Sequence, residues 1–286
     1  AGVAENAVPA TATLTLPASE AARLEQAIAA LPEEQRQVLA IAAVEQNVQL
    51  TARGQSGHAA FPENTRNAIP LLLDALLAAN LLEGDDLTAA RIISQLLADP
   101  WGISAGFAAE DAPTGKLTLN GGLLTPHHNG LNLHLDIRYP LATDKDALLA
   151  TLRKAIAPLN GTLSITSDAS PIHVDKESEL VKRLQQTYDT IAEVITEPYS
   201  MGGGTHARYL PNSITFGPGF RRIEGELFQG ESVRTKPAFI PAGHGSPHGP
   251  DEFVVIENLK RAFKVYAVAI PRLDSWLEQG LMDGVR

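Results

Sequence analysis

The amino-acid sequence predicts an α+β fold with an antiparallel sheet. Stretches that alternate polar and apolar residues, typical of half-buried strands, are interleaved with stretches of helical periodicity. One pair of expected strands flanks His128-Asn129-Gly130, and an Asn-Gly turn favours a hairpin because both residues tolerate a positive φ. With 286 residues, the chain is long enough for one large or two medium domains with a buried core.

The first half of the chain reads as strands and helices in alternation. Thr residues alternate with Ala or Leu at 10–16, as in a strand, whereas Leu24, Ala27, Ile28 and Leu31 recur at helical spacing. The expected elements are, in order, a strand (10–16), a helix (18–31), a strand (44–53), helices (67–82 and 87–98), a hairpin (117–124 and 131–139), a helix (144–157) and a strand (162–166).

A break in the pattern near residues 168–172 separates this part from the second half. There we expect a helix at 178–194, a strand at 213–216 and a final helix at 253–269, followed by a tail that packs through its apolar residues. The two halves therefore predict two structural parts.

Composition excludes several classes of function. The 23 Lys and Arg residues against 33 Asp and Glu give a formal charge of −10, which argues against binding nucleic acid or an anionic membrane. The absence of cysteine excludes disulfides, thiolate metal sites and cysteine nucleophiles. No apolar run reaches the roughly 18 residues of a membrane span. We therefore expect a soluble, cytoplasmic protein, and since the chain begins without Met we expect a segment to precede it.

A first candidate site lies in the Gly-rich stretch 54–63. His58 stands between a turn and a helix start, where small neighbours would leave its ring able to donate a hydrogen bond outward. The alternative is a turn histidine that is satisfied by backbone groups. The residue types favour neither interpretation.

The strand at 131–139 carries a second candidate. Its alternation places Leu131, Leu133, Leu135 and Ile137 toward the core and Arg138 on the opposite face. An arginine there can bind a carboxylate bidentately. The pattern alone favours the simpler alternative, an ion pair with Asp136.

Two further clusters lie in the second half. Gly202-Gly203-Gly204 allows close backbone approach and can direct N–H groups at an anion, although a tight turn is the alternative. His248 lies in a Gly- and Pro-rich loop beside Asp251 and is a candidate metal ligand. Pro247 precludes helical chelation by His244 and His248 together.

Taken in order, these clusters resemble the M20 family of zinc aminoacylases, carboxypeptidases and dipeptidases, and within it the peptidase V (carnosinase-like dipeptidase) branch. The motifs that carry the resemblance are Asn6–Pro9, Gly54–Pro62, Leu135–Pro140, Gly202–Arg208 and His248–Glu252. Each motif alone is weak, but together they occur in the family's order over nearly the whole chain.

The resemblance implies a ferredoxin-like α+β lid domain at residues 1–173, and the C-terminal part of a zinc-exopeptidase α/β domain at 174–286. It implies that His58 stabilises the oxyanion and that His248 is a zinc ligand. Asn6 and Arg138 would bind the substrate, Arg138 through a terminal carboxylate. Gly203 and Gly204 would offer backbone contacts. The implied reaction is hydrolysis of dipeptides by water activated at two zinc ions.

The family's remaining metal residues and its general base are missing from this sequence, and His173-Val174-Asp175 falls at the wrong end of the lid to replace them. A zinc hydrolase needs about three or four ligands. We therefore expect the complete enzyme to be active, with a small peptide as substrate, and this chain alone to be inactive without its N-terminal metal-binding segment.

Three alternatives stay open. The chain could be a non-catalytic binding or dimerisation module on the same fold, or part of an M20 amidohydrolase that acts on N-acyl amino acids. A serine hydrolase is the least supported of the three, since the Gly-x-Ser-x-Gly nucleophile motif is absent.

Overall fold

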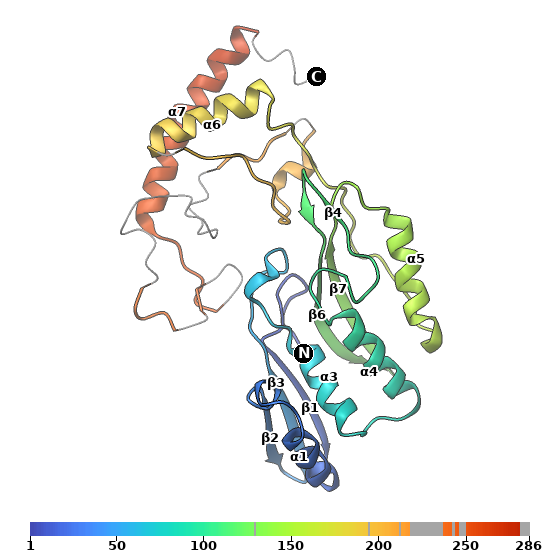
Figure 1. The fold of residues 1–286 in the computed structure, drawn as a ribbon. Coiled ribbons are helices and arrows are strands. Elements are labelled where there is room, and N and C mark those ends of the chain that lie inside the picture. Colours follow the sequence, from blue (N-terminus) through green and yellow to red (C-terminus); the bar gives the residue numbers. More distant parts are fainter. Residues whose placement is uncertain are drawn as a thin grey trace. The chain divides into compact units, whose positions relative to one another are not determined.

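The computed structural model describes residues 1–128, 130–193, 195–211, 213–217, 237–241, 244–245 and 250–280. The chain divides into two compact units (Figure 1). The first contains Ala1–Asp168, and the second contains most of the described residues from Ala169 onward. The assignment of residues 1–173 to a lid and 174–286 to a catalytic part stays a prediction.

A three-stranded antiparallel sheet lies at one end of the first unit. Its strand order is β1 (Thr11–Pro17), β3 (Asn47–Arg53) and β2 (Leu39–Val44). The alternation of β3 buries Val48, Leu50 and Ala52, as the sequence predicts. Strand β2 was not expected, and residues 44–46 belong to its hairpin with β3 rather than to the start of β3.

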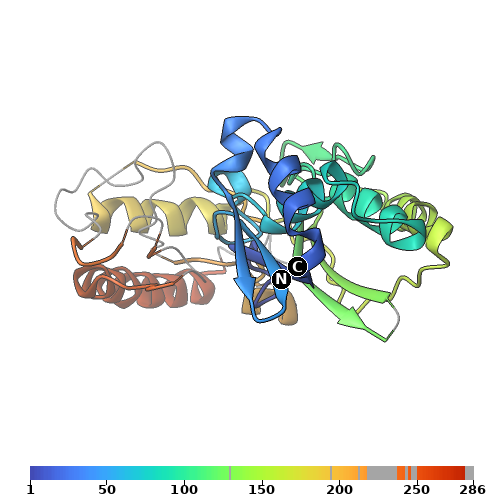
Figure 2. The same ribbon diagram turned by 90° about the horizontal axis from the view of Figure 1, so that it is seen from below.

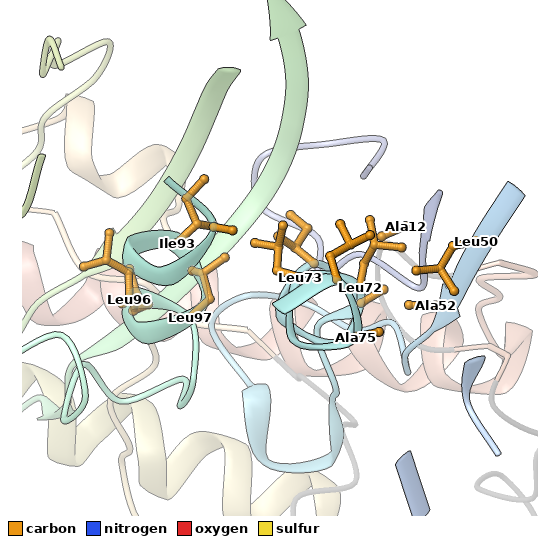
Figure 3. Close-up of a cluster of buried hydrophobic side chains, with 14 of the residues drawn as sticks. Ala12, Leu50, Ala52, Leu72, Leu73, Ala75, Ile93, Leu96 and Leu97 are labelled. Carbon is orange, nitrogen blue, oxygen red and sulfur yellow. The ribbon is translucent and has the colours of Figure 1, made fainter. Parts of the chain in front are cut away.

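Helices cover this sheet. The first unit contains η1 (Ala18–Glu20), α1 (Ala21–Ala29), α2 (Glu33–Arg36), η2 (Pro62–Asn64), α3 (Ala68–Ala78) and α4 (Gly84–Leu96). Helix α3 begins at Ala68 because the Asn67 side chain accepts a hydrogen bond from the Ile69 amide at 2.9 Å. In Figure 3 the α3 side chains lie between those of the sheet and those of α4, which places α3 at the centre of the core.

The predicted hairpin is confirmed as β6 (Thr118–His127) and β7 (Gly130–Arg138), which follow the short pair β4 (Glu110–Asp111) and β5 (Gly115–Lys116). Its register shifts at a bulge between Gly121 and Leu123. Leu133, Leu135 and Ile137 pack on the core as expected, but Leu131 is about half exposed, because it lies at the start of β7, at the turn end of the hairpin, where it pairs with Pro126.

The helix predicted at 144–157 is confirmed as α5 (Lys145–Ile156), which Asp144 caps, followed by η3 (Ala157–Leu159). The strand expected at 162–166 is wrong. These residues are mostly exposed and pair with no described strand, so their β-forming side chains have no ladder to join. The predicted α+β class is confirmed, with several small antiparallel sheets in place of one.

The second unit is built on α6 (Glu179–Ala192) and α7 (Ile256–Glu278), which lie side by side (Figures 1 and 2), and contains the short helix η4 (His206–Tyr209). Tyr188 and Val265 form the buried contact between the two long helices. The strand expected at 213–216 is wrong: the Phe216 carbonyl accepts a hydrogen bond from the Tyr266 hydroxyl at 3.2 Å instead of pairing in a ladder.

Helix α7 continues through Pro271, although the sequence predicted its end at 269. Two contacts with α6 hold its last turns: Arg272 donates to the Thr187 hydroxyl at 3.3 Å, and the Arg183 guanidinium lies 5.0 Å from the Trp276 ring centre. Within the described ranges, the helices include none that is both apolar enough and long enough to cross a bilayer.

Candidate functional site

Backbone pairing brings Asn6 and His58 together in the first unit. Ala7 and His58 form an antiparallel bridge. On either side of it, the Val8 amide donates to the Gly57 carbonyl at 2.9 Å, and the Ala59 amide donates to the Asn6 carbonyl at 2.9 Å. Two of the sequence motifs, about fifty residues apart, therefore share one short ladder.

The loop that carries His58 is fixed at its start by Gly54. A Cβ on Gly54 would lie 2.0 Å from the Arg66 carbonyl oxygen, so only glycine fits there. The close approach allows Gln55 and Arg66 to exchange two backbone hydrogen bonds, at 2.8 and 2.9 Å. The Gly-rich motif therefore works as a tight strand-like connection between β3 and α3.

The His58 ring is half-buried and oriented by its own loop. Its Nδ1 atom accepts a hydrogen bond from the Ala60 amide at 2.9 Å, and its ring centre lies 5.6 Å from that of Phe61. An Nδ1 that accepts a hydrogen bond leaves the proton of the neutral ring on Nε2. The Nε2–H group is thus the hydrogen-bond donor of the neutral His58 ring.

Sequence reasoning missed a buried amide network beside this ladder. Asn120 in β6 donates to the Glu5 carbonyl at 3.1 Å and to the Ala7 carbonyl at 3.0 Å. Asn67 donates to Asn120 Oδ1 at 3.2 Å and to the Gly121 carbonyl at 2.9 Å. The one signal in the sequence is an asparagine among the apolar residues of the strand predicted at 117–124, which indicates a buried amide but does not identify its partners.

Arg138 and Asp136 form the ion pair that the sequence favoured. The guanidinium donates from Nε to Oδ1 at 3.1 Å and from Nη2 to Oδ2 at 2.8 Å. Both side chains are less than a fifth exposed. A partly buried, bidentate pair fixes the plane of the guanidinium, because two parallel hydrogen bonds restrain its rotation.

Farther along β7, His134 contacts the N-terminal segment. Its Nδ1 lies 2.7 Å from Glu5 Oε1, and its Nε2 lies 3.0 Å from Asn132 Nδ2. The polar face of β7 is therefore occupied by side-chain pairs along most of its length.

Tyr139, next to Arg138, belongs to a separate polar cluster. Its hydroxyl donates to Asp168 at 2.8 Å, and Lys145 donates to the other oxygen of Asp168 at 2.7 Å. The hydrogen bond from Lys145, followed by that from Tyr139, lowers the pKa of Asp168. Burial of Tyr139, together with the Asp168 carboxylate, raises the pKa of the phenol.

The glycine cluster belongs to the second unit, whereas Asn6, His58 and Arg138 belong to the first. Gly203 is half-buried and Gly204 is exposed. The Arg208 guanidinium occupies the space that a Cβ on Gly204 would need. The neighbouring Thr205 caps η4 by accepting a hydrogen bond from the Ala207 amide at 3.3 Å.

The predicted metal ligand His248 lies outside the described residues. Among the described residues that flank it in the sequence, His244 Nδ1 lies 2.7 Å from Asp251 Oδ2, an arrangement that also orients histidine ligands in metal sites. Where the structure describes side chains, it brings together no three His, Asp or Glu residues that could hold a metal ion. The described donors therefore do not make a zinc site by themselves.

Comparison with known proteins decides the family. A model of the peptidase dimerisation domain of the M20 family matches residues 46–162, the stretch from β3 to the end of α5 and η3. The chain belongs to the M20 peptidase family. The resemblance to the M20 family, drawn from the five motifs, is thereby confirmed at the level of the family.

Relatives of this M20 chain support the same assignment. It is 32% identical over 235 residues to the putative dipeptidase YtjP of Bacillus subtilis, which covers 81% of this chain and 46% of the relative. Putative dipeptidases of Staphylococcus saprophyticus (28% identical) and Staphylococcus aureus strain USA300 (27%) each match 65% of this chain and 40% of their own length. The M20 chain therefore spans less than half the length of these curated relatives.

Proposed function

We propose that the protein to which this M20 chain belongs is a zinc-dependent dipeptidase, with residues 1–173 as its substrate-binding lid and 174–286 as the C-terminal part of its catalytic domain. The observation that carries the proposal is the bridge between Ala7 and His58, which joins two family motifs into one structure. The names of the relatives, putative dipeptidases, support the peptide substrate.

In this proposal His58 donates its Nε2–H to the oxyanion that forms when water attacks the scissile carbonyl. A preorganised donor of this kind stabilises the charge of the transition state more than that of the substrate. The hydrogen bond from Ala60 supports this role because it fixes both the tautomer and the ring orientation. Gly203 and Gly204 would add backbone contacts to the substrate.

Asn6 and Arg138 would bind the substrate. Arg138 would hold the terminal carboxylate of the dipeptide, a group that a guanidinium matches in shape and charge. Asp136 would keep the guanidinium in place before the substrate arrives. A free carboxylate at one end would also distinguish a dipeptide from the interior of a longer chain.

Zinc would supply an activated water molecule in this class of hydrolase, with His248 as one ligand. The matched ligand in this sequence is a single histidine, so the chain alone is expected to be inactive and to bind zinc weakly.

The decisive experiment replaces His58 in the full-length protein. In His58→Ala, turnover of a dipeptide should fall by about 100- to 1,000-fold, the range for loss of an oxyanion donor, while metal content stays the same. His127→Ala, an exposed histidine at the end of β6, is the control and should keep full turnover. Unchanged turnover in His58→Ala would contradict the proposal, and preferred hydrolysis of N-acyl amino acids would redirect it to an amidohydrolase.

A second candidate is a non-catalytic binding or dimerisation module. It is favoured by one finding, namely that the matched family model describes a dimerisation domain. Sedimentation of the 286-residue chain and zinc calorimetry separate the two candidates. A stable dimer that binds no zinc, together with a full-length protein that hydrolyses no dipeptide, would favour the module, whereas tight stoichiometric zinc binding would exclude it.

A further inference from the structure

We infer that Asn120 is a positioning residue for Asn6 and His58, an inference that rests on the proposed function of that pair. Its side chain donates to two backbone carbonyls and accepts from the side chain of Asn67. It is only 4% exposed, and it donates two hydrogen bonds and accepts one, at 3.0 to 3.2 Å. A buried amide with this many partners holds a defined geometry, because each lost partner would leave a polar group unsatisfied.

The two carbonyls that Asn120 holds lie on either side of Asn6. The side-chain amide donates to Glu5 and to Ala7, so the backbone around Asn6 is fixed from the β6 side. The same backbone forms the bridge to His58 from its other side. Asn120 is therefore one residue removed from His58: it binds the Ala7 carbonyl, and Ala7 pairs with His58.

Asn67 determines which way the Asn120 amide points. Asn67 Oδ1 accepts from the Ile69 amide, so its Nδ2 is directed at Asn120 Oδ1 and at the Gly121 carbonyl. Asn120 must then place its own Nδ2 toward the two carbonyls of the N-terminal segment. The first turn of α3 is thereby connected through two amides to the loop that holds His58.

The consequence for catalysis is specific. A change at Asn120 shifts the segment 5–7 and with it both functional residues, without removing any group that contacts substrate. A small displacement of an oxyanion donor lowers the rate of the chemical step more than it lowers substrate affinity. The expected signature is a fall in kcat that is larger than any rise in KM caused by the displacement of Asn6.

Asn120→Asp tests this in the full-length protein because the change is isosteric. The aspartate keeps an acceptor for Asn67 but turns an oxygen toward two carbonyl oxygens. We expect kcat to fall at least about tenfold with KM changed less than about threefold. Asn67→Asp keeps the acceptor that caps α3 but loses the side-chain NH2 group that donates to Asn120 and to the Gly121 carbonyl. It should therefore also lower kcat. This variant serves as the test if Asn120→Asp does not fold. Asn47→Asp, an exposed residue of β3, is the matched control.

Nitrogen-15 NMR of the His58 ring in the 286-residue chain supplies a readout that does not need activity. Wild type and Asn47→Asp should show the Nε2–H tautomer, and Asn120→Asp and Asn67→Asp should show a changed tautomer population or a mobile ring. If both network variants match Asn47→Asp in NMR and in kcat, the inference is overturned. If the full-length protein hydrolyses no dipeptide but the His58 signals shift, the proposed function fails and the positioning role stands.

Discussion

The Nδ1 atom of His58 accepts a hydrogen bond from the backbone amide of Ala60 at 2.9 Å, so the ring presents Nε2–H as its donor. Because the donor is at Nε2, replacing His58 by glutamine or by asparagine should have different effects. Glutamine can place its side-chain NH2 near the position of Nε2, whereas asparagine reaches only as far as Nδ1.

His58→Gln should therefore keep about tenfold more turnover than His58→Asn in the full-length protein, since a flexible amide near Nε2 recovers about 1.4 kcal/mol of the few kcal/mol that one donor to an oxyanion contributes. The measurement is kcat on a dipeptide at saturating concentration, with circular dichroism to compare folding. Equal or higher turnover in His58→Asn would show that the donor is not at Nε2.

The loop after α4 depends on Asp99. Its carboxylate accepts hydrogen bonds from the amides of Trp101, Ile103 and Ser104 at 2.8, 3.1 and 2.6 Å. Burial alone would raise the pKa of Asp99, but the hydrogen bonds from Ser104 and its neighbours outweigh burial, and the pKa is lowered.

A lowered pKa means that ionised Asp99 stabilises the fold above its unfolded pKa of about 3.9, and that this contribution is lost as the pH falls through the folded pKa. Asp99→Asn should lower the free energy of unfolding by about 1 kcal/mol at pH 7, after allowing for solvent screening, and by less below about pH 4. Urea unfolding at both pH values checks this, with exposed Glu25→Gln in α1 as control. A difference independent of pH would contradict it.

Core packing gives a third prediction. Leu50 is completely buried between its neighbours in β1 and β2 and the helix α3, whereas Leu131 is 51% exposed. Leu50→Ala should lower the free energy of unfolding by about 3 kcal/mol through lost burial and a residual cavity. Leu131→Ala should lower it by less than about 0.5 kcal/mol. Urea denaturation of the chain measures both, and similar values for the two would contradict the assignment of the core.

Local pattern explains which elements the sequence could predict. The strand β1, the helix α5 and the β6–β7 hairpin were predicted because each carries its own periodicity or turn residues. Strand β2 was missed because its sequence, Leu39–Val44, is a short apolar run without alternation, and pairing with β3 alone makes it a strand. At 162–166 a strand was predicted but none forms, again because pairing decides the outcome: the strand-like residues there lack a partner strand.

The candidate site shows the same difference between features with a local sequence pattern and features that depend on contacts in the folded chain. Residues Asn6 and His58 could be named from their motifs, and the Asp136–Arg138 pair from its spacing on one strand. The hydrogen bonds of Asn120 to Glu5 and Ala7 could not be predicted, because they join residues more than a hundred positions apart that meet only in the folded chain. Long-range amide networks leave no periodic signal in a sequence.

A last prediction concerns the close approach of the N-terminal segment to β6 at Gly122. A Cβ on Gly122 would lie 2.1 Å from the Glu5 carbonyl oxygen and 2.6 Å from its Cα, and backbone atoms cannot turn aside as a side chain can. Gly122→Ala must therefore displace the segment 1–7 from β6, at a cost of about 2 kcal/mol or more.

The displacement should have two measurable effects. The amides of Val8 and Ala59, which close the ladder between Asn6 and His58, should exchange with deuterium at least about tenfold faster, since 1.4 kcal/mol corresponds to a factor of ten in the opening equilibrium. Gly130→Ala is the control, because its Cβ would meet only the His127 carbonyl oxygen at 3.9 Å and should leave exchange unchanged. Unaltered protection of both amides in Gly122→Ala would show that contact with β6 does not hold the ladder, since a segment pushed off the strand could not keep its pairing with the His58 loop.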